Sequence, residues 1–286
     1  MARVGIDLLT WDVGSETSSP QEYMRLVVSR VLESWQQGAD IVLLPEYTWM
    51  GLERFITAPD KMAGVANLFW QKLWPEIKTS LKTSDKAVVL GTVPALLENG
   101  TLRNRAPILL AGKICFQDKL QLTPWEKSMT HGDVLNVWTF RELRFAVLIC
   151  LDIEVPELAV ALRNQQVDLI LVPSATENVL GVERIGRCAS ARAVELGCHV
   201  GVAHLVGQMD SELVDENMGR LAWFSPSQST FQDLPREDVT ESFSKGHYKK
   251  QCILETSLLK RMRARRVETN PAALTPKPFA VELIEP

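Results

Sequence analysis

Residues 144–158 read RFAVLICLDIEVPEL, and this stretch decides the fold. Residues 145–149 form a short continuous apolar run, which is typical of a strand buried on both faces of a sheet. Pro156 stands where the first turn of a helix tolerates proline, and an apolar-periodic segment follows it. Cys150 is therefore predicted on the turn between a buried strand and a helix start, where open α/β sheets build their sites.

A cysteine at the end of an apolar run is, on its own, more often a small core residue than a reactive one. Two other apolar runs, however, also end on ionisable residues. DIVLLPE, residues 40–46, ends on Glu46, and KICFQDK, residues 113–119, ends on Lys119. An isolated glutamate or lysine is usually a solvated surface residue, so the functional hypothesis depends on the three strand ends meeting in one pocket.

Length and charge restrict the classes of function. The chain has 286 residues, 46% of them hydrophobic, which predicts a sizeable core and a single domain over residues 1–286. A net charge of -4 gives no general attraction to nucleic acid or anionic membranes and fits a small-molecule substrate. The basic run KRMRARR at 260–266 is interpreted as a solvated helix face or a subunit contact. No run approaches the length of a membrane span.

The cysteine and histidine usage predicts neither disulfides nor a metal site. The five cysteines are scattered and odd in number, which indicates a reducing, cytoplasmic location rather than a disulfide framework. His199 and His204 flank a buried strand at a spacing that does not suit a metal-binding helix, so they are interpreted as core or interface residues. We expect no metal and no cofactor.

The apolar pattern along the chain alternates between strands and helices. Strands are predicted at residues 4–9, 40–46, 87–93, 106–110, 114–116, 134–140, 145–149, 168–175, 199–206 and 252–254. Helices are predicted at 20–37, at 60–78 with a bend or end at Pro75, from Cys150 to about residue 166, and at 181–196. The polar stretches 120–133 and 225–250 are predicted loops, the first a candidate site loop.

Alternating strands and helices indicate α/β layers, and the hairpins indicate mixed sheets. DIVLLPE at 40–46 and DLILVPS at 168–174 are each a helix exit, a buried strand and a proline. Their likeness indicates an internally duplicated sandwich, with two sheets back to back and helices outside.

These segments resemble a known family. Glu46 in LLPE, Lys119 in QDKLQL and Cys150 in ICLDIEVPEL resemble the Glu-Lys-Cys triad of the nitrilase superfamily, the carbon-nitrogen hydrolases. VPSA at 172–175 and RCASARAVELGCHV at 187–200 are similar to two further segments of that family. Any one motif is weak, but the ordered set is strong.

The resemblance covers roughly residues 1–230 and implies a four-layer α-β-β-α sandwich with two mixed sheets, commonly paired as a homodimer. It also implies activity on a nonpeptide C–N bond of a small-molecule amide or nitrile. Residues after about 226 form an extension in doubt, because FSPS at 224–227 replaces the Asp/Asn-Pro-x-Gly turn of the family.

The resemblance assigns a role to each candidate residue. Cys150 is the nucleophile, Glu46 the general base, and Lys119 the group that stabilises the anion together with the backbone N–H of one further residue. Glu126, in LTPWE, matches a second glutamate of the family that positions the lysine and substrate. The expected substrate-binding residues are Leu151, which supplies that N–H, Trp125, Tyr47 and Thr176; ordinary loop packing is an equal alternative for Trp125.

Two features of the nucleophile segment bear on specificity. Glu154 stands where many relatives carry arginine, which places a negative charge near the site entrance. Asp152 and Glu154 are expected to oppose thiolate formation at Cys150. Cys150-Leu151-Asp152 is more similar to the amidase and carbamoylase branch than to nitrilases.

The sequence therefore predicts an amidase-type hydrolase that works through a cysteine thioester and releases ammonia or an amine. The alternatives are a true nitrilase, an N-carbamoyl hydrolase, and a catalytically idle relative used as a binding or regulatory module.

Overall fold

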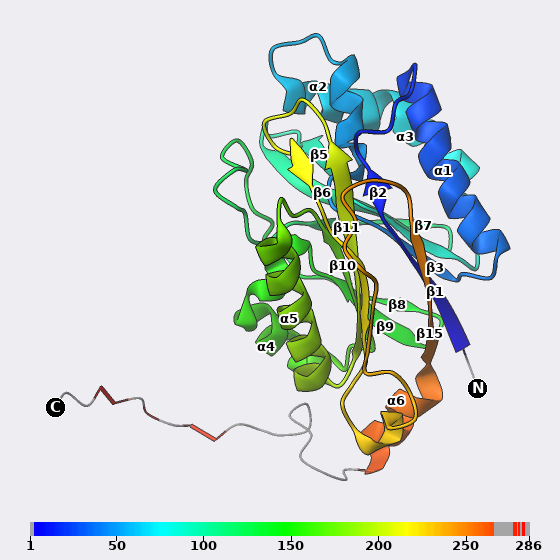
Figure 1. The fold of residues 1–286 in the computed structure, drawn as a ribbon, viewed down its shortest axis with the longest axis vertical. Helices are drawn as coiled ribbons and strands as arrows, with labels where there is room; N and C mark the ends of the chain where they lie inside the picture. The colour runs from blue at the N-terminus through cyan, green and yellow to red at the C-terminus, as the bar shows by residue number, and fades with distance from the viewer. Residues whose placement is uncertain (1–2, 266–276, 279, 281, 284–286) are drawn as a thin grey trace.

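A computed structural model describes residues 3–265, 277–278, 280 and 282–283. Two sheets stack at the centre of the molecule and helices cover their outer faces (Figure 1). The predicted α/β class and four-layer α-β-β-α sandwich are confirmed. Both sheets are mixed, because each contains parallel and antiparallel neighbours.

The first sheet has seven strands and contains the strand that leads to Glu46. Along the sheet the order is β15 (Lys249–Glu255), β1 (Arg3–Leu9), β3 (Ile41–Leu44), β4 (Ala87–Leu90), β6 (Leu102–Leu110) and β5 (Val93–Leu96), and β7 (Lys113–Asp118) also pairs with β6. The central strands β1, β3 and β4 are parallel, and all four residues of β3 are buried.

The second sheet has eight strands and contains the strand that leads to Cys150. Its order is β14 (Glu237–Val239), β13 (Leu221–Phe224), β11 (His199–Gln208), β10 (Leu169–Ser174), β9 (Leu143–Val147) and β8 (Val137–Phe140), with β12 (Glu216–Asn217) and β2 (Trp11–Asp12) pairing with β11. Its parallel centre is β9, β10 and β11.

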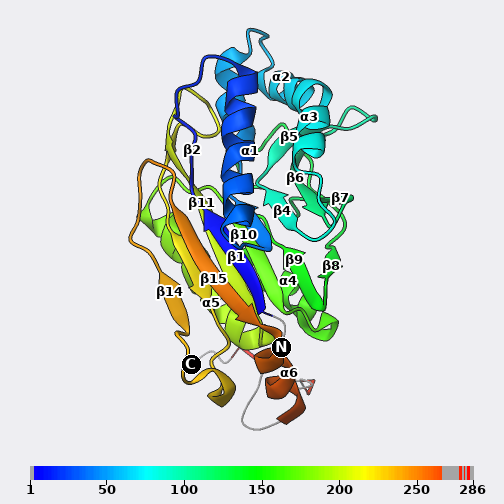
Figure 2. The same ribbon diagram turned by 90° about the vertical axis from the view of Figure 1, so that its right-hand side faces the viewer.

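Helices form the two outer layers (Figure 2). The first sheet is covered by α1 (Pro20–Gln36), α2 (Lys61–Asn67), a π-helical turn (Leu68–Leu73) and α3 (Trp74–Ser80), with a 3-10 helix, η1 (Thr48–Phe55), after Glu46. The second is covered by α4 (Pro156–Leu162) and α5 (Val179–Leu196), preceded by a 3-10 helix, η3 (Cys150–Glu154). Short 3-10 helices span Arg163–Gln165 and Ser229–Phe231, and α6 (Thr256–Arg265) ends this part of the chain. None of the described helices is long and apolar enough to cross a membrane.

Prolines explain where the helices differ from the sequence prediction. The helix predicted from Cys150 to residue 166 is broken: η3 ends at Glu154, Val155 is extended, and α4 begins at Pro156. Pro156 lacks the N–H that a continuous helix would need at that position. The helix predicted at 60–78 likewise passes through a π-helical turn immediately before the turn that contains Pro75.

The segment 225–250 was predicted as a loop, and this is wrong in part. β14 pairs with β13 in antiparallel register, and β15 begins at Lys249. β14 is a short edge strand whose residues are mostly exposed, so it lacks the apolar pattern that identifies a buried strand.

Two apolar clusters hold the layers together. One lies between the sheets and includes Ile6, Leu43, Phe145 and Leu171, and the other joins the first sheet to its helices. His199 is buried against the rings of Trp223 and Phe231. Burial lowers the pKa of His199 to about 3 and that of His204 to about 4, so both imidazoles are neutral core groups.

Candidate active site

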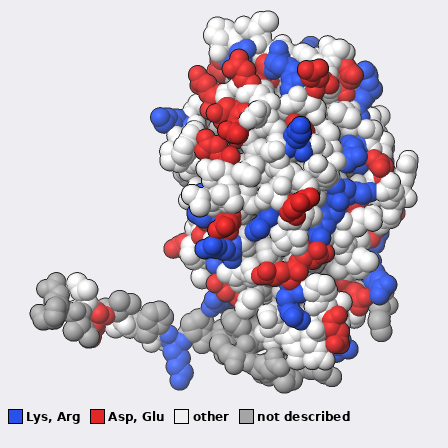
Figure 3. Space-filling view, viewed as in Figure 1, with Lys and Arg blue, Asp and Glu red and all other residues white. Residues whose placement is uncertain are grey.

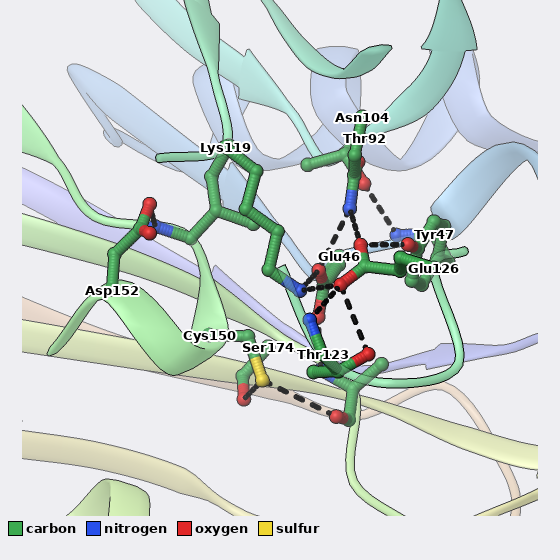
Figure 4. Close-up of polar contacts among 12 residues, drawn as sticks. Glu46, Tyr47, Thr92, Asn104, Lys119, Thr123, Glu126, Cys150, Asp152 and Ser174 are labelled. Carbon is green, nitrogen blue, oxygen red and sulfur yellow. Dashed lines mark hydrogen bonds and ion pairs between the residues drawn. The ribbon is translucent and has the colours of Figure 1, made fainter. Parts of the chain in front are cut away.

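The structure brings together the three ionisable strand-end residues. Glu46 follows β3, Lys119 follows β7 and Cys150 follows β9, so both sheets deliver side chains to one end of the sandwich. Figure 4 shows the Lys119 amine beside the carboxylates of Glu46 and Glu126, with the Cys150 sulfur below them in this view. All four side chains are buried.

Lys119 is a buried cation held by two carboxylates. Its Nζ lies 2.8 Å from Glu46 Oε1 and 2.9 Å from Glu126 Oε2, and only 1% of its side chain is exposed. Burial by itself lowers the pKa of Lys119, but Glu46, Cys150 and Glu126 together raise it above its ordinary value. Lys119 is therefore an ammonium at neutral pH. Two of its three N–H donors are used by the glutamates, so the third can reach a substrate oxygen.

Glu46 accepts three hydrogen bonds. Its Oε1 accepts from Lys119 and from Asn104 Nδ2 at 2.9 Å, and its Oε2 accepts from the N–H of Ala175 at 3.1 Å. Burial raises the pKa of Glu46, and the charge of Glu126 raises it further, while Lys119 opposes both. The pKa of Glu46 therefore lies above the ordinary glutamate value, and this direction makes a carboxylate a more effective general base near neutral pH.

The pKa of Glu126 is displaced in the opposite direction, below its ordinary value. Its carboxylate accepts from Lys119, from the Tyr47 hydroxyl, from Asn104 at 3.0 Å, and from the N–H and hydroxyl of Thr123 at 2.8 and 3.0 Å. Burial raises the pKa of Glu126, but Lys119 and these hydrogen bonds outweigh it and lower the pKa overall. Two neighbouring glutamates whose pKa values are displaced in opposite directions indicate a division of labour between base and fixed anion.

Cys150 has a strained backbone and a protonated thiol. Its φ of +47° lies in the left-handed region, a conformation that non-glycine residues adopt uncommonly and at a cost in free energy. The thiol donates to the carbonyl of Ala175 and accepts from the Ser174 hydroxyl, each at 3.4 Å. Burial and the charge of Glu46 raise the pKa of Cys150 to about 12. To act as a nucleophile, the Cys150 thiol must therefore lose its proton.

Asp152 and Glu154 were expected to oppose thiolate formation at Cys150, but each is engaged by other groups. Asp152 accepts instead from the backbone N–H groups of Leu120, Gln121 and Ile149, at 3.1, 2.8 and 3.0 Å. It therefore links the loop after Lys119 to the strand end before Cys150. Glu154 forms an ion pair with Arg184, whose Nε lies 3.1 Å from Glu154 Oε2. The main acidic influence on the thiol is Glu46.

Asn104 and Ser174 are functional candidates that sequence reasoning missed. Asn104 Nδ2 donates to both glutamates. The backbone carbonyl of Asn104 accepts the backbone N–H of Lys119 at 2.9 Å. A signal was present for Asn104: it shares the alternating inward side of β6 with the core residues Ala106 and Ile108. Ser174 ends β10 within the VPSA segment that is similar to the family, but the sequence assigned that serine no role.

The expected substrate-binding residues all line one cavity of about 330 Å³ with Glu46, Lys119 and Cys150. Leu151 is in the first turn of η3, where backbone N–H groups have no partner inside the helix. Trp125 is 67% exposed, so it is a surface wall of the cavity. The Tyr47 hydroxyl supports Glu126, and Thr176 Oγ1 donates to the carbonyl of Met218 at 2.8 Å.

Metal ligands are not grouped in the part of the chain that the structure describes. No three histidine, cysteine or acidic side chains there are arranged to hold a metal ion. The two glutamates of the site are occupied by Lys119.

The four-layer sandwich is the fold of solved proteins of the nitrilase superfamily, among them Nit3 of Saccharomyces cerevisiae, with a TM-score of 0.69 and 17% identity over 95% of this chain and 97% of that one. The chain belongs to the carbon-nitrogen hydrolase family, whose model matches residues 10–235. It is similar to the probable hydrolase YhcX of Bacillus subtilis (strain 168), with 27% identity over 199 residues. That alignment covers 68% of this chain and 39% of YhcX, so the chain spans less than half the length of this relative.

Solved structures give the same fold. XC1258 from Xanthomonas campestris, a CN-hydrolase superfamily protein, superposes with a TM-score of 0.72 and 18% identity over 99% of this chain and 100% of that one. An amidase from Nesterenkonia sp. superposes with a TM-score of 0.66 and 19% identity over 91% and 94% of the two chains.

Proposed function

We propose that this carbon-nitrogen hydrolase is an amidase that uses Cys150 as its nucleophile. The observation that carries the proposal is the buried Lys119 ammonium, held by Glu46 and Glu126 at 2.8 and 2.9 Å beside a cysteine with left-handed backbone. Burying a cation between two carboxylates is costly for stability alone. Its placement is better explained by chemistry that needs a fixed positive charge.

The first half of the reaction forms a thioester. Glu46 takes the thiol proton while the Cys150 sulfur attacks the amide carbon, and a sulfur–carbon bond forms. The carbonyl oxygen becomes an oxyanion that accepts hydrogen bonds from the free Lys119 N–H and the N–H of Leu151. Glu46 then returns the proton to the nitrogen, the C–N bond breaks, and ammonia leaves.

The second half releases the acid. Glu46 takes a proton from a water molecule as that water attacks the thioester carbon. The sulfur–carbon bond breaks, Cys150 leaves as a thiolate, and Glu46 returns the proton to it. The high pKa of Cys150 makes this final protonation favourable. Glu126 stays ionised throughout and holds Lys119 in place.

Ammonia release from amides, matching nitriles and N-carbamoyl compounds tests the proposal. We expect release from amides, and loss of about 10²-fold or more for Lys119→Met, since removing one oxyanion donor typically costs about 10²- to 10³-fold. Cys150→Ala is the inactive control. Release from nitriles but not from amides would identify a nitrilase instead.

Reaction with iodoacetamide separates an enzyme from an idle relative. We expect Cys150 to be alkylated faster than the half-buried Cys188, with the difference abolished by Glu46→Gln. Equal rates at the two cysteines, together with no ammonia from any substrate, would favour a catalytically idle protein.

A further inference from the structure

The mouth of the active-site cavity is strongly acidic. Besides Glu46 and Lys119, its lining contains one arginine, Arg184, and five carboxylates. These carboxylates are Glu154, Glu177, Glu212, Asp215 and Glu216. They come from three separate segments: the end of η3, the β10–α5 connection, and the β11–β12 region. Figure 3 shows acidic side chains gathered where Figure 1 draws the connection after β11.

The single arginine does not offset this charge. Arg184 Nε lies 3.1 Å from Glu154 Oε2, so these two residues neutralise each other. Within the described part of the chain, Glu177, Glu212, Asp215 and Glu216 form no ion pair. Four exposed, uncompensated carboxylates therefore face the opening.

Trp125 supplies a second, independent feature of the same opening. Trp125 is 67% exposed, whereas Glu46, Lys119 and Cys150 in the same cavity are buried. An aromatic face beside carboxylates is the combination that attracts an ammonium group, through the ring quadrupole and through charge. The acidic side chains are not grouped tightly enough to hold a metal ion in the described residues. An organic ammonium ion therefore fits this surface better than a metal ion.

We propose that the substrate is a small amide with a positively charged amine at the end distant from the scissile bond. The amide carbon sits at Cys150, and the ammonium lies at the mouth against Trp125 and the four carboxylates. The cavity of about 330 Å³ suits a short chain between the two ends. This inference rests on the proposed amidase function and adds its specificity.

Three amides of matched size test the inference. 4-Aminobutyramide is cationic at neutral pH, pentanamide is its neutral counterpart, and succinamic acid is an anionic counterpart. We expect kcat/KM for ammonia release to be at least about tenfold higher for the cation than for the neutral amide, and lowest for the anion. Raising the salt concentration to about 0.5 M should reduce the preference, because exposed charges are screened.

Variants assign the preference to the mouth. Glu212→Gln and Asp215→Asn should each lower the ratio of cationic to neutral kcat/KM by about two- to fivefold. Trp125→Ala should lower it by a similar factor, with Trp125→Phe intermediate. The matched controls are Glu98→Gln and Asp233→Asn, exposed acids outside the cavity, which should leave the ratio unchanged.

Binding to the Cys150→Ala variant, measured by calorimetry, separates failure of this inference from failure of the amidase proposal. Tighter binding of the cationic amide without turnover by the wild type would support the acidic mouth and overturn the amidase. Turnover of all three amides with equal kcat/KM would support the amidase and overturn the cationic substrate. Equal binding of all three amides would also overturn it, as would equal effects of Glu212→Gln and Glu98→Gln.

Discussion

Two glutamates share one lysine in this site, and the environment separates their proton affinities. Glu46 borders the thiol and has only backbone and amide donors besides Lys119, so burial dominates and raises its pKa. Glu126 collects five donors, which keep its pKa low despite burial. The same side-chain type therefore has a raised pKa in Glu46, next to the sulfur, and a lowered pKa in Glu126.

The pH dependence of kcat/KM should report Glu46. The base must be ionised, so activity falls as pH drops through its pKa, and the acid limb should lie above the ordinary glutamate value of 4.5. Glu46→Gln should lower kcat/KM by about 10²- to 10⁴-fold across the pH range. A steady-state pH profile of the amidase reaction checks both, and an acid limb below 4.5 would contradict the assignment.

Asn104 should act as a positioning residue. Asn104→Ala removes the amide that joins the two carboxylates, so we expect unfolding to be easier by about 1–3 kcal/mol and kcat to fall more than KM changes. Denaturant unfolding and steady-state kinetics measure the two effects. Asn164→Ala, an exposed asparagine on the surface, is the control, and equal effects of the two substitutions would contradict this role.

At the residue scale, the sequence indicated the groups that end strands. Glu46, Lys119 and Cys150 each close an apolar run, and this pattern is visible without coordinates. Asn104 and Ser174 could not be found in that way, since one lies inside a strand and the other is a common residue type at a strand end. Their importance comes from which side chains face them across the two sheets.

At the scale of elements, Asp152 joins two segments that arrive from different sheets. It accepts from the backbone of the β7–β8 loop and from Ile149 just before the nucleophile. Lys119 and Cys150 flank these contacts directly. The relative position of cation and sulfur therefore depends on a carboxylate that touches neither reacting atom.

Asp152→Asn should loosen that link and alter the pH dependence of stability. Burial raises the pKa of Asp152 to about 7 from 3.8, so the folded protein binds its proton more tightly than the unfolded chain. The resulting stabilisation is complete below pH 3.8 and is lost as pH rises to about 7. The wild type should therefore lose more stability than Asp152→Asn between pH 4 and 7 in denaturant titrations. Parallel pH curves for the two proteins would count against this coupling.

The element pattern was predictable where strands are buried and less so elsewhere. β3 is apolar throughout, and β9 and β10 each contain one polar residue, Arg144 and Ser174, so the existence of these strands followed from the sequence alone. The interruption between η3 and α4 depends on Val155 being extended before Pro156, a local choice that apolar periodicity does not encode. β14 was missed because an exposed edge strand needs no apolar pattern.

At the scale of the whole molecule, the first and last strands of the described fold lie side by side. β15 pairs with β1 along its whole length, from Arg3 opposite Glu255 to Leu9 opposite Lys249 (Figure 2). This strand lies beyond residue 235, where the family match ends. Within the region that the sequence left in doubt, β15 is therefore part of the first sheet and β14 is part of the second.

A chain cut after residue 235 should consequently fail as a soluble protein. It would retain Glu46, Lys119 and Cys150. The edge of β1 that pairs with β15 would, however, have unpaired backbone donors and acceptors, which can bind strands of neighbouring molecules and cause aggregation. Light scattering during refolding should show the shortened chain forming large particles at concentrations where the full chain stays clear. Clear solutions of both chains would mean that the first sheet tolerates an unpaired β1 edge. β15 would then have a role other than preventing association between molecules.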